Sequence, residues 1–342
     1  MANSETNRER NLNENRVWIR LYDENSEVTD EYLKAIGAAY ASMGREVRYV
    51  RELDDIATAK SDVVVLAVAF DVFKFLRRGY RHVVYWSQGV WPEESYLRHH
   101  SKLRFSICSA IEKAALRGSE RLFLVSGAML RHYEEKYGIS ITDKSMIMAC
   151  SNETFHREAF HVEGKYNRPV FTYAGSLVQY QCIDQTLEAF RAIKERLPQA
   201  ELLLFTGQTD EAKKKIELLG VSGVTVDCKP RQDLWRYISR AKYGFVLRED
   251  CTINRVATPT KISTYLANGV IPVYSKCLEG FSETSAGIPR LAFDPDTFVD
   301  DLVEFEKSHI NPDMIESQYA GYFADHLDLA SKQPVIREFL SR

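Results

Sequence analysis

The sequence predicts an α/β protein with two doubly wound domains, each built on a parallel sheet. Three observations support this prediction. Short β-rich runs alternate with amphipathic helical stretches, a pattern typical of parallel sheets joined by right-handed crossovers. Runs such as DVVVLAVAF (Asp62–Phe70) are apolar almost throughout, as expected for strands covered on both faces. The length of 342 residues suits two domains better than one core.

The elements follow one another in two series. The first series has a helix from about Thr29 to Met43 and strands at Val17–Tyr22, Glu46–Val50, Asp62–Phe70, His82–Gly89 and Arg121–Ser126. A polar, poorly periodic segment then separates it from the second series. The second series has five strands, each followed by a segment able to form a helix, at Pro169–Gly175, Glu201–Gly207, Val224–Cys228, Tyr243–Arg248 and Val270–Ser275.

These series give the predicted domain boundaries. We expect a disordered tail at residues 1–14, an N-terminal Rossmann-like domain at 15–150, a linker at 151–168, a C-terminal Rossmann-like domain at 169–325 and a C-terminal helical segment at 326–342. In doubly wound domains, ligands bind at the carboxyl ends of the strands.

Composition and missing motifs exclude several classes of protein. A net charge of −3 argues against a nucleic-acid binder. The six cysteines are scattered, without metal-ligand spacing, so we expect no metal site, no disulfide framework and a reducing cytoplasm. The polar N-terminus does not resemble a signal peptide, and no apolar run is long enough to span a bilayer. Because no predicted strand is followed by GxGxxG or by a Walker pattern, dehydrogenase and P-loop chemistry are disfavoured.

One stretch, NRVATPTKISTYLANGVIPV (Asn254–Val273), has an unusual helix start. Thr258 is a suitable N-cap and Pro259 a suitable first helical residue, which leaves the amides of Thr260 and Lys261 free in the first turn. A lysine at the positive end of the helix dipole is reasonable if an anion binds there. A capped core helix with a solvated lysine is the alternative, and these residues alone leave both open. The buried stripe is expected at Ile262, Tyr265 and Leu266, and the helix is expected to end at Gly269.

The wider segment YGFVLREDCTINRVATPTKISTYLANGVIPV closely resembles the donor-binding segment of retaining glycosyltransferases of the family-4 type, also called glycosyltransferases group 1. The stretch FTYAGSLVQYQCIDQTLEAF (Phe171–Phe190) is similar to the first strand, glycine turn and helix of their donor domain. The resemblance covers about residues 166–290 well and the N-terminal half weakly. It implies the GT-B fold, in which two Rossmann-like domains face a central cleft. The N-terminal domain would bind the acceptor and the C-terminal domain a UDP- or GDP-linked sugar.

Carried over by position, the resemblance implies a donor site. Arg248 and Lys261 would be the catalytic residues that contact the donor diphosphate, which removes the need for a metal or another cofactor. The remaining donor-binding positions are Gly175 and Ser176 at the glycine turn, Asn254 and Arg255 on the loop, and Thr260, Thr264 and Glu283. Arg255 in a surface salt bridge and a plain turn at Gly175 remain as structural alternatives.

Two departures from the family pattern concern this site. Thr264 stands where a glutamate usually accepts hydrogen bonds from the ribose hydroxyls; Glu249, Asp250 or Glu283 could substitute for it. Ser176 and Gln181 stand where basic residues are often found. Arg248 and Lys261 would then carry most of the charge that binds phosphate.

The acceptor site is predicted at Gln88, Glu93 and Glu94. The two glutamates also suit a helix N-terminus for structural reasons alone. Between Asp71 and Arg121, ten Lys/Arg oppose five Asp/Glu, and Phe73, Phe75 and Leu76 interleave with the cations. This face could rest on anionic lipid at the inner face of the membrane, although an ordinary charged surface explains it too.

The sequence therefore predicts a glycosyltransferase of hexosyltransferase type that acts with retention. Its acceptor would be a glycan or a lipid-linked saccharide, and family analogy points to capsule, O-antigen or related envelope polysaccharide synthesis. Two alternatives remain. One is a non-catalytic partner subunit of a transferase, which the threonine at position 264 favours. The other is a nucleotide-sugar epimerase, which would need an acid/base pair that the sequence does not clearly offer.

Overall fold

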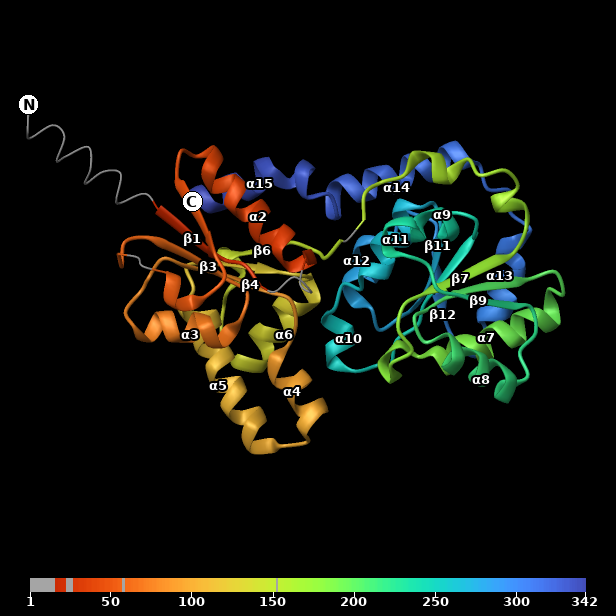
Figure 1. Ribbon diagram of the computed structural model, residues 1–342, viewed down its shortest axis with the longest axis horizontal. Helices are drawn as coiled ribbons and strands as arrows, with labels where there is room; N and C mark the ends of the chain where they lie inside the picture. Colours follow the sequence, from red (N-terminus) through yellow and green to blue (C-terminus); the bar gives the residue numbers. More distant parts are fainter. Residues whose placement is uncertain (1–15, 23–26, 57–58, 152) are drawn as a thin grey trace, which may run out of the picture. The chain divides into compact units, whose positions relative to one another are not determined.

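The computed structural model describes residues 16–22, 27–56, 59–151 and 153–342 (Figure 1). The predicted disordered tail at residues 1–14 lies outside this range. The chain divides into two compact units. Unit 1 comprises the residues up to Ala149 together with Asp328–Arg342, and unit 2 comprises Cys150–Leu327.

Unit 1 contains a parallel sheet of six described strands in the order β2-β1-β3-β4-β5-β6. The strands are β1 (Arg16–Arg20), β2 (Glu46–Val50), β3 (Val63–Leu66), β4 (Val83–Ser87), β5 (Arg121–Leu124) and β6 (Ser145–Ile147). The predicted strand at Asp62–Phe70 is too long, because helix α3 already begins at Ala69. The short edge strand β6 was not predicted, because three residues of mixed polarity carry too little alternation.

The helices of unit 1 include one from the far end of the chain. They are α2 (Glu27–Ser42), α3 (Ala69–Arg77), α4 (Trp91–His99), α5 (Lys102–Gly118), α6 (Gly127–Tyr137) and α15 (Leu329–Ser341). The C-terminal helix α15 packs beside α2 (Figure 1), and Gln333 Nε2 donates to Ala35 O over 3.1 Å. Arg121 Nε likewise donates to Phe339 O over 3.2 Å. The predicted C-terminal helical segment therefore completes unit 1, which the sequence did not indicate.

Unit 2 contains the second parallel sheet, in the order β12-β11-β10-β7-β8-β9. Its strands are β7 (Val170–Ala174), β8 (Glu201–Phe205), β9 (Val224–Asp227), β10 (Tyr243–Val246), β11 (Ile271–Ser275) and β12 (Leu291–Phe293). Taken in chain order, this is the Rossmann arrangement 3-2-1-4-5-6, and the strand order reverses between β7 and β10. The five predicted strands are confirmed, whereas β12 was missed because three residues are too few to show a strand pattern.

The helices of unit 2 surround this sheet. They are α7 (Ile183–Arg196), α8 (Thr209–Leu219), α9 (Leu234–Ile238), α10 (Thr252–Val256), α11 (Thr260–Ala267), α12 (Glu279–Thr284), α13 (Phe298–Glu306) and α14 (Pro312–His326). Helix α11 buries Ile262, Tyr265 and Leu266, as predicted. Within the described chain, no helix combines the length and the hydropathy that a membrane crossing requires.

Both ends of α11 are fixed by residues distant in sequence. The helix begins at Thr260, and Thr258 is not its N-cap as predicted. The Thr258 hydroxyl instead accepts a hydrogen bond from the Cys150 amide over 3.0 Å. At the other end, Lys165 Nζ donates to Asn268 O and Tyr166 Oη to Gly269 O. The segment expected as a linker therefore packs against α11, and a buried cation lies at the negative end of the helix dipole.

Candidate functional site

The strand-order reversal of unit 2 lies beside two residues that the sequence analysis selected. Gly175 follows β7, and Arg248 follows β10 by two residues. In doubly wound sheets, ligands bind at this point, outside the carboxyl ends of the strands. Gly175 has φ of +146°, which L side chains rarely adopt, and a Cβ there would lie 2.8 Å from Lys261 Cε. Glycine thus leaves room for the lysine beside the turn.

Arg248 and Lys261 converge on one oxygen atom. Lys261 Nζ donates to Gln181 Oε1 over 2.6 Å, and Arg248 Nη1 donates to the same oxygen. The two cations come from different elements, since Arg248 follows β10 and Lys261 lies in the first turn of α11. Lys261 Nζ also lies 3.8 Å from the centre of the Tyr173 ring, a cation–π contact. The structure therefore brings together the two residues predicted to be catalytic.

The electrostatics of this pair favour an anion. Burial and, secondarily, the neighbouring Arg248 hold the pKa of Lys261 well below its ordinary value. Burial likewise lowers the pKa of Arg248. Gln181 supplies only a carbonyl dipole between them, and among the described residues no carboxylate is bonded to either cation. An anion bound here would relieve their mutual repulsion and accept charge-assisted hydrogen bonds from both.

Two further predicted residues lie in the short helix α10, between β10 and α11, and not on a loop as predicted; both make local contacts. Asn254 is buried, and its Nδ2 donates to Glu249 O over 2.9 Å. Arg255 is exposed and pairs with Asp250, its Nε lying 2.6 Å from Oδ1 and its Nη2 3.1 Å from Oδ2. The structural alternative for Arg255, a surface salt bridge, is what the structure contains. Asn254 holds the shape of the loop.

The remaining predicted donor residues take different positions. Thr264 Oγ1 donates to Thr260 O over 3.2 Å, a bond within helix α11. Ser176 is exposed in the turn after β7, and its carbonyl accepts from Tyr173 Oη over 2.6 Å. Glu283 is exposed on α12. Asp250 is one of the three carboxylates that could replace the missing glutamate at the ribose. Its side chain is already paired with Arg255.

A pocket of about 550 Å³ lies beside Arg248, past the ends of β10, β11 and β12. Its walls include Arg248 and Glu249 and, at and just after the end of β11, Ser275 and Cys277. Arg248 lines this pocket, and its guanidinium also donates to the Gln181 oxygen that accepts from Lys261. The pocket therefore adjoins the pair of cations and supplies space next to them.

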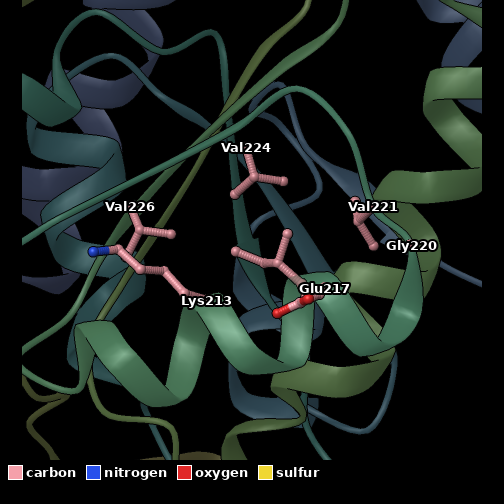
Figure 2. Close-up of a pocket in the computed structure, with 7 residues that line it drawn as sticks. Lys213, Glu217, Gly220, Val221, Val224 and Val226 are labelled. Atoms are coloured by element: carbon pink, nitrogen blue, oxygen red, sulfur yellow. The ribbon is translucent and has the colours of Figure 1, made fainter.

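A second pocket lies elsewhere in unit 2 and does not share these features. Figure 2 shows it between helix α8 and the edge strand β9, with Val224 and Val226 on one side and Lys213 and Glu217 on the other. Its volume is about 300 Å³ and most of its lining is aliphatic. None of the predicted site residues lines it, so we do not assign the donor to this pocket.

The predicted acceptor residues lie at or after the carboxyl end of β4 in unit 1. Gln88 is exposed, and its Oε1 accepts from Thr29 Oγ1 over 3.2 Å. Glu94 packs against Gly89, where an added Cβ would lie only 2.1 Å from Glu94 Oε1. Burial raises the pKa of Glu94. Glu93 is bound by Lys136 Nζ at 2.7 Å and by His132 Nε2 at 3.2 Å.

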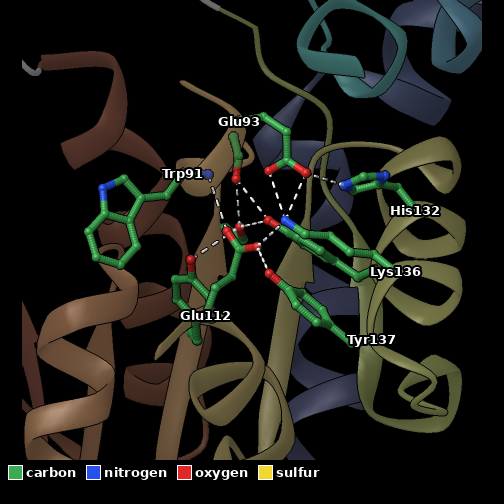
Figure 3. A network of polar contacts seen from close by, with 10 residues as sticks. Trp91, Glu93, Glu112, His132, Lys136 and Tyr137 are labelled. Atoms are coloured by element: carbon green, nitrogen blue, oxygen red, sulfur yellow. Dashed lines mark hydrogen bonds and ion pairs between the residues drawn. The ribbon is translucent and has the colours of Figure 1, made fainter. Parts of the chain in front are cut away.

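Sequence analysis missed the centre of this cluster, the buried Glu112 on α5. Figure 3 shows Lys136 between the carboxylates of Glu93 and Glu112. Tyr137 Oη donates to Glu112 Oε2 over 2.6 Å, and the Trp91 amide to Oε1 over 3.1 Å. Burial raises the pKa of Glu112 to about 7. A glutamate within an otherwise mixed helix gave no signal in the sequence that it would be buried.

Glu112 is expected to make unit 1 less stable as pH rises. Its pKa is raised from 4.5 to about 7, so the folded state binds more protons between these values and its stability falls with rising pH. The effect is at most about 3 kcal/mol. We expect Glu112→Gln to flatten this dependence and to stabilise the protein at pH 8. Urea unfolding of both proteins at several pH values checks this, and equal slopes between pH 5 and pH 7 would contradict it.

Within the described residues, no group of three or more His, Cys, Asp or Glu is arranged to hold a metal ion. The contact from Gln181 was not predicted, although its position had been noted as one where a basic residue is common. A cation–π partner at Tyr173 was also not predicted. Nothing in the spacing of either residue indicates a contact with a helix about 80 positions later, since α11 begins at Thr260.

Comparison with known proteins supports the fold. No protein-family model matches the chain, and no curated protein matches its sequence. HepE from Anabaena, solved with UDP and glucose, superposes with a TM-score of 0.64 at 13% identity, covering 95% of this chain and 99% of HepE. Sucrose-phosphate synthase from Thermosynechococcus elongatus gives 0.64 at 11% identity, covering 95% of this chain and 98% of the synthase.

A further similar structure is a TarM variant from S. aureus, solved with fondaparinux, α-GlcNAc-glycerol and UDP. It gives a TM-score of 0.58 at 7% identity, covering 83% of this chain, which spans 55% of TarM. Together with the two parallel sheets, these likenesses show that the chain has the GT-B fold with two Rossmann-like units.

Proposed function

We propose that this protein is a glycosyltransferase that transfers a sugar from a nucleoside-diphosphate sugar to a saccharide acceptor. One observation carries the proposal: Arg248 and Lys261, from different elements, converge at the strand-order reversal of unit 2. Two cations beside a glycine turn suit the two phosphates of such a donor. The GT-B neighbours support the same class, since HepE and TarM were solved with UDP.

In this proposal, the two cations stabilise the leaving group. As the bond between the sugar and the diphosphate breaks, negative charge develops on the phosphate oxygen that leaves with the nucleotide. Arg248 and Lys261 donate hydrogen bonds to these oxygens, in a part-buried place where such bonds are strong. The open backbone at Gly175 permits close approach of a phosphate. No metal is required when fixed cations supply this charge.

The family resemblance extends the proposal to the stereochemistry. A retaining enzyme keeps the anomeric configuration of the donor in its product. The acceptor hydroxyl would attack from the face that the diphosphate leaves, and its proton would pass to a phosphate oxygen. Glu94 and Gln88 are the proposed acceptor contacts, because the Glu93 carboxylate is already bound by Lys136 and His132. Envelope polysaccharide synthesis in the cytoplasm is the proposed setting, by analogy alone.

A donor screen tests this function. The protein is incubated with UDP- and GDP-linked hexoses, without and then with a set of saccharide and lipid-linked acceptors, and release of UDP or GDP is measured. We expect one donor to be turned over, and proton NMR of the product to show the anomeric configuration of the donor. Inversion would contradict the retaining mechanism. Binding of nucleotide without any turnover or hydrolysis would favour the non-catalytic partner subunit.

We also propose that unit 1 contacts anionic lipid, through a surface different from the one predicted. Phe75 on α3 is buried and Phe73 is part-buried, so the predicted apolar face is turned inward. The hairpin of α4 and α5 is more open: Leu103 is 74% exposed, and Leu97 and Ile107 are more than half exposed. From Tyr96 to Ile111 the chain carries Arg98, Lys102 and Arg104 and no acidic residue, which suits an anionic surface.

Introducing acidic residues at the apolar positions of this hairpin is expected to weaken lipid binding strongly. Wild type should sediment with phosphatidylcholine vesicles that contain about 30% phosphatidylglycerol and remain free of pure phosphatidylcholine vesicles. The double variant Leu103→Glu/Ile107→Glu should lose at least about tenfold in partitioning, since each side chain contributes about 1.5–3 kcal/mol when buried. Leu218→Glu, at an 86% exposed position on α8 of unit 2, is the matched control. Equal binding of all three proteins would overturn the assignment.

A further inference from the structure

The hydrogen bonds around Gln181 suggest a role for this side chain that the donor site alone does not require. Its Oε1 accepts from Arg248 Nη1 and from Lys261 Nζ, the latter over 2.6 Å. A neutral amide oxygen thus occupies the point on which two cationic donors converge. That point is also where a terminal oxygen of a bound phosphate would accept hydrogen bonds from both cations.

We propose that the side chain of Gln181 occupies the anion position of the ligand-free site and that the phosphates of the ligand displace it. This inference rests on the proposed donor site, since the displaced contact is one that the donor would make. Gln181 is then a residue that sets the affinity of the site for its ligand. It acts by competing for Arg248 and Lys261.

The local structure allows such a displacement. Gln181 ends the short 3₁₀ turn Gln179–Gln181, which precedes α7, and its side chain is part-buried. Cys182, which follows it, has φ of +50°, a value uncommon for a residue with a Cβ. The amide can leave the cations by rotating about its own side-chain bonds, without unfolding α7. The backbone of Arg248 is held independently of Gln181, because its amide donates to Ser275 Oγ over 2.8 Å.

Displacement has a cost and a gain that can be compared. The ligand must break two hydrogen bonds from cations to a neutral acceptor, and it replaces them with bonds to a charged acceptor, which add the attraction between opposite charges. Removing the amide would remove the cost and leave the gain. Replacing the amide by a carboxylate would install a tethered anion, which competes much more strongly than the neutral oxygen.

These considerations predict opposite effects for two substitutions. With inorganic pyrophosphate as the probe, Gln181→Ala is expected to bind about 3- to 10-fold more tightly than wild type, the equivalent of one competing hydrogen bond. Gln181→Glu is expected to bind at least about 10-fold more weakly, since the ion pair must be broken. Gln199→Glu, at an exposed position before β8, introduces the same charge elsewhere and should leave binding unchanged.

Isothermal titration calorimetry with pyrophosphate, UDP and GDP tests the inference. It is supported if Gln181→Ala tightens and Gln181→Glu weakens the binding of pyrophosphate. It is overturned if Gln181→Ala weakens binding, because Gln181 would then be a ligand of the anion, or if both variants bind as wild type does.

A second readout needs no ligand and separates this inference from the proposed function. Gln181→Glu should raise the midpoint of thermal unfolding of the ligand-free protein at low salt, because its carboxylate pairs with both cations, and Gln199→Glu should not. If these shifts occur and pyrophosphate binds as expected while no nucleotide or nucleotide sugar binds, the displaced-amide inference stands and the proposed function fails. If nucleotides bind but neither variant behaves as expected, the proposed function stands and the inference fails.

Discussion

Lys261→Met is expected to stabilise the ligand-free protein and to abolish most of its binding of nucleoside diphosphates. The Lys261 ammonium is part-buried beside Arg248, and burial lowers its pKa. The charge on this lysine therefore destabilises the folded state. Methionine keeps the length of the side chain, and its sulfur can replace the contact with the Tyr173 ring. We expect a gain of about 1 kcal/mol in unfolding free energy. Binding of UDP or GDP should weaken about 10- to 100-fold.

Another lysine whose pKa is lowered by burial, Lys165, provides the matched control for this experiment. Lys165 lies at the opposite end of α11, is buried, and has a pKa lowered by burial. Its Nζ donates to Ala159 O over 2.8 Å and to Asn268 O. Lys165→Met leaves both carbonyls without this donor, so it should destabilise the protein by about 1–3 kcal/mol while diphosphate binding is retained. Thermal unfolding and calorimetry distinguish the two variants. Destabilisation by both, with equal loss of binding, would contradict the assignment of Lys261.

The pH dependence of binding gives a further check on Lys261. An anion favours the ammonium form, so binding should raise the pKa of Lys261 and take up protons from the buffer. Affinity should therefore fall as pH rises through the lowered pKa of the lysine. Calorimetry in two buffers of different ionisation enthalpy measures the proton uptake, which should disappear in Lys261→Met.

Arg248→Ala is expected to have the largest effect on turnover. The Arg248 guanidinium is part-buried and donates to the oxygen to which Lys261 also donates, and no carboxylate among the described residues forms an ion pair with it. Removing such a donor to a developing oxyanion costs about 100- to 1000-fold in rate. We expect this loss in kcat/KM with the donor identified by the screen.

Arg255→Ala is the control for Arg248, because both arginines lie in the segment between β10 and α11. Arg255 forms an exposed ion pair with Asp250, and such pairs contribute about 0–1 kcal/mol. Its removal should change kcat/KM by no more than about twofold. A large loss in Arg255→Ala, or a small one in Arg248→Ala, would show that the phosphates bind on the other side of the loop.

Much of the fold could be predicted from the sequence, because it depends on local patterns. Continuous apolar runs such as Val63–Leu66 and Ile271–Ser275 are buried strands, and the glycine after β7 has the backbone conformation that glycine permits. The short strands β6 and β12 were missed, since three residues carry no usable periodicity. The packing of α15 on unit 1 was also missed, because it joins residues about 300 positions apart, as in the bond from Gln333 to Ala35.

The candidate site could be predicted only in part. The sequence identified Arg248 and Lys261 from a helix start and a family resemblance, and these residues do lie together. It could not distinguish Arg255, with its partner Asp250, from a phosphate ligand, because residue type alone does not fix the direction of a side chain. Nor could it predict that the side chain of Gln181 would lie between the two cations. Such contacts depend on tertiary structure across about 70 to 80 residues.

The most direct test of the donor site is a crystal structure of the protein with the nucleoside diphosphate that calorimetry identifies as its ligand. We expect oxygens of the diphosphate to accept hydrogen bonds from the Arg248 guanidinium and the Lys261 ammonium, beside the backbone of Gly175, with the Gln181 amide moved away. A diphosphate bound elsewhere, with the Arg248–Gln181–Lys261 contacts intact, would contradict the proposed site.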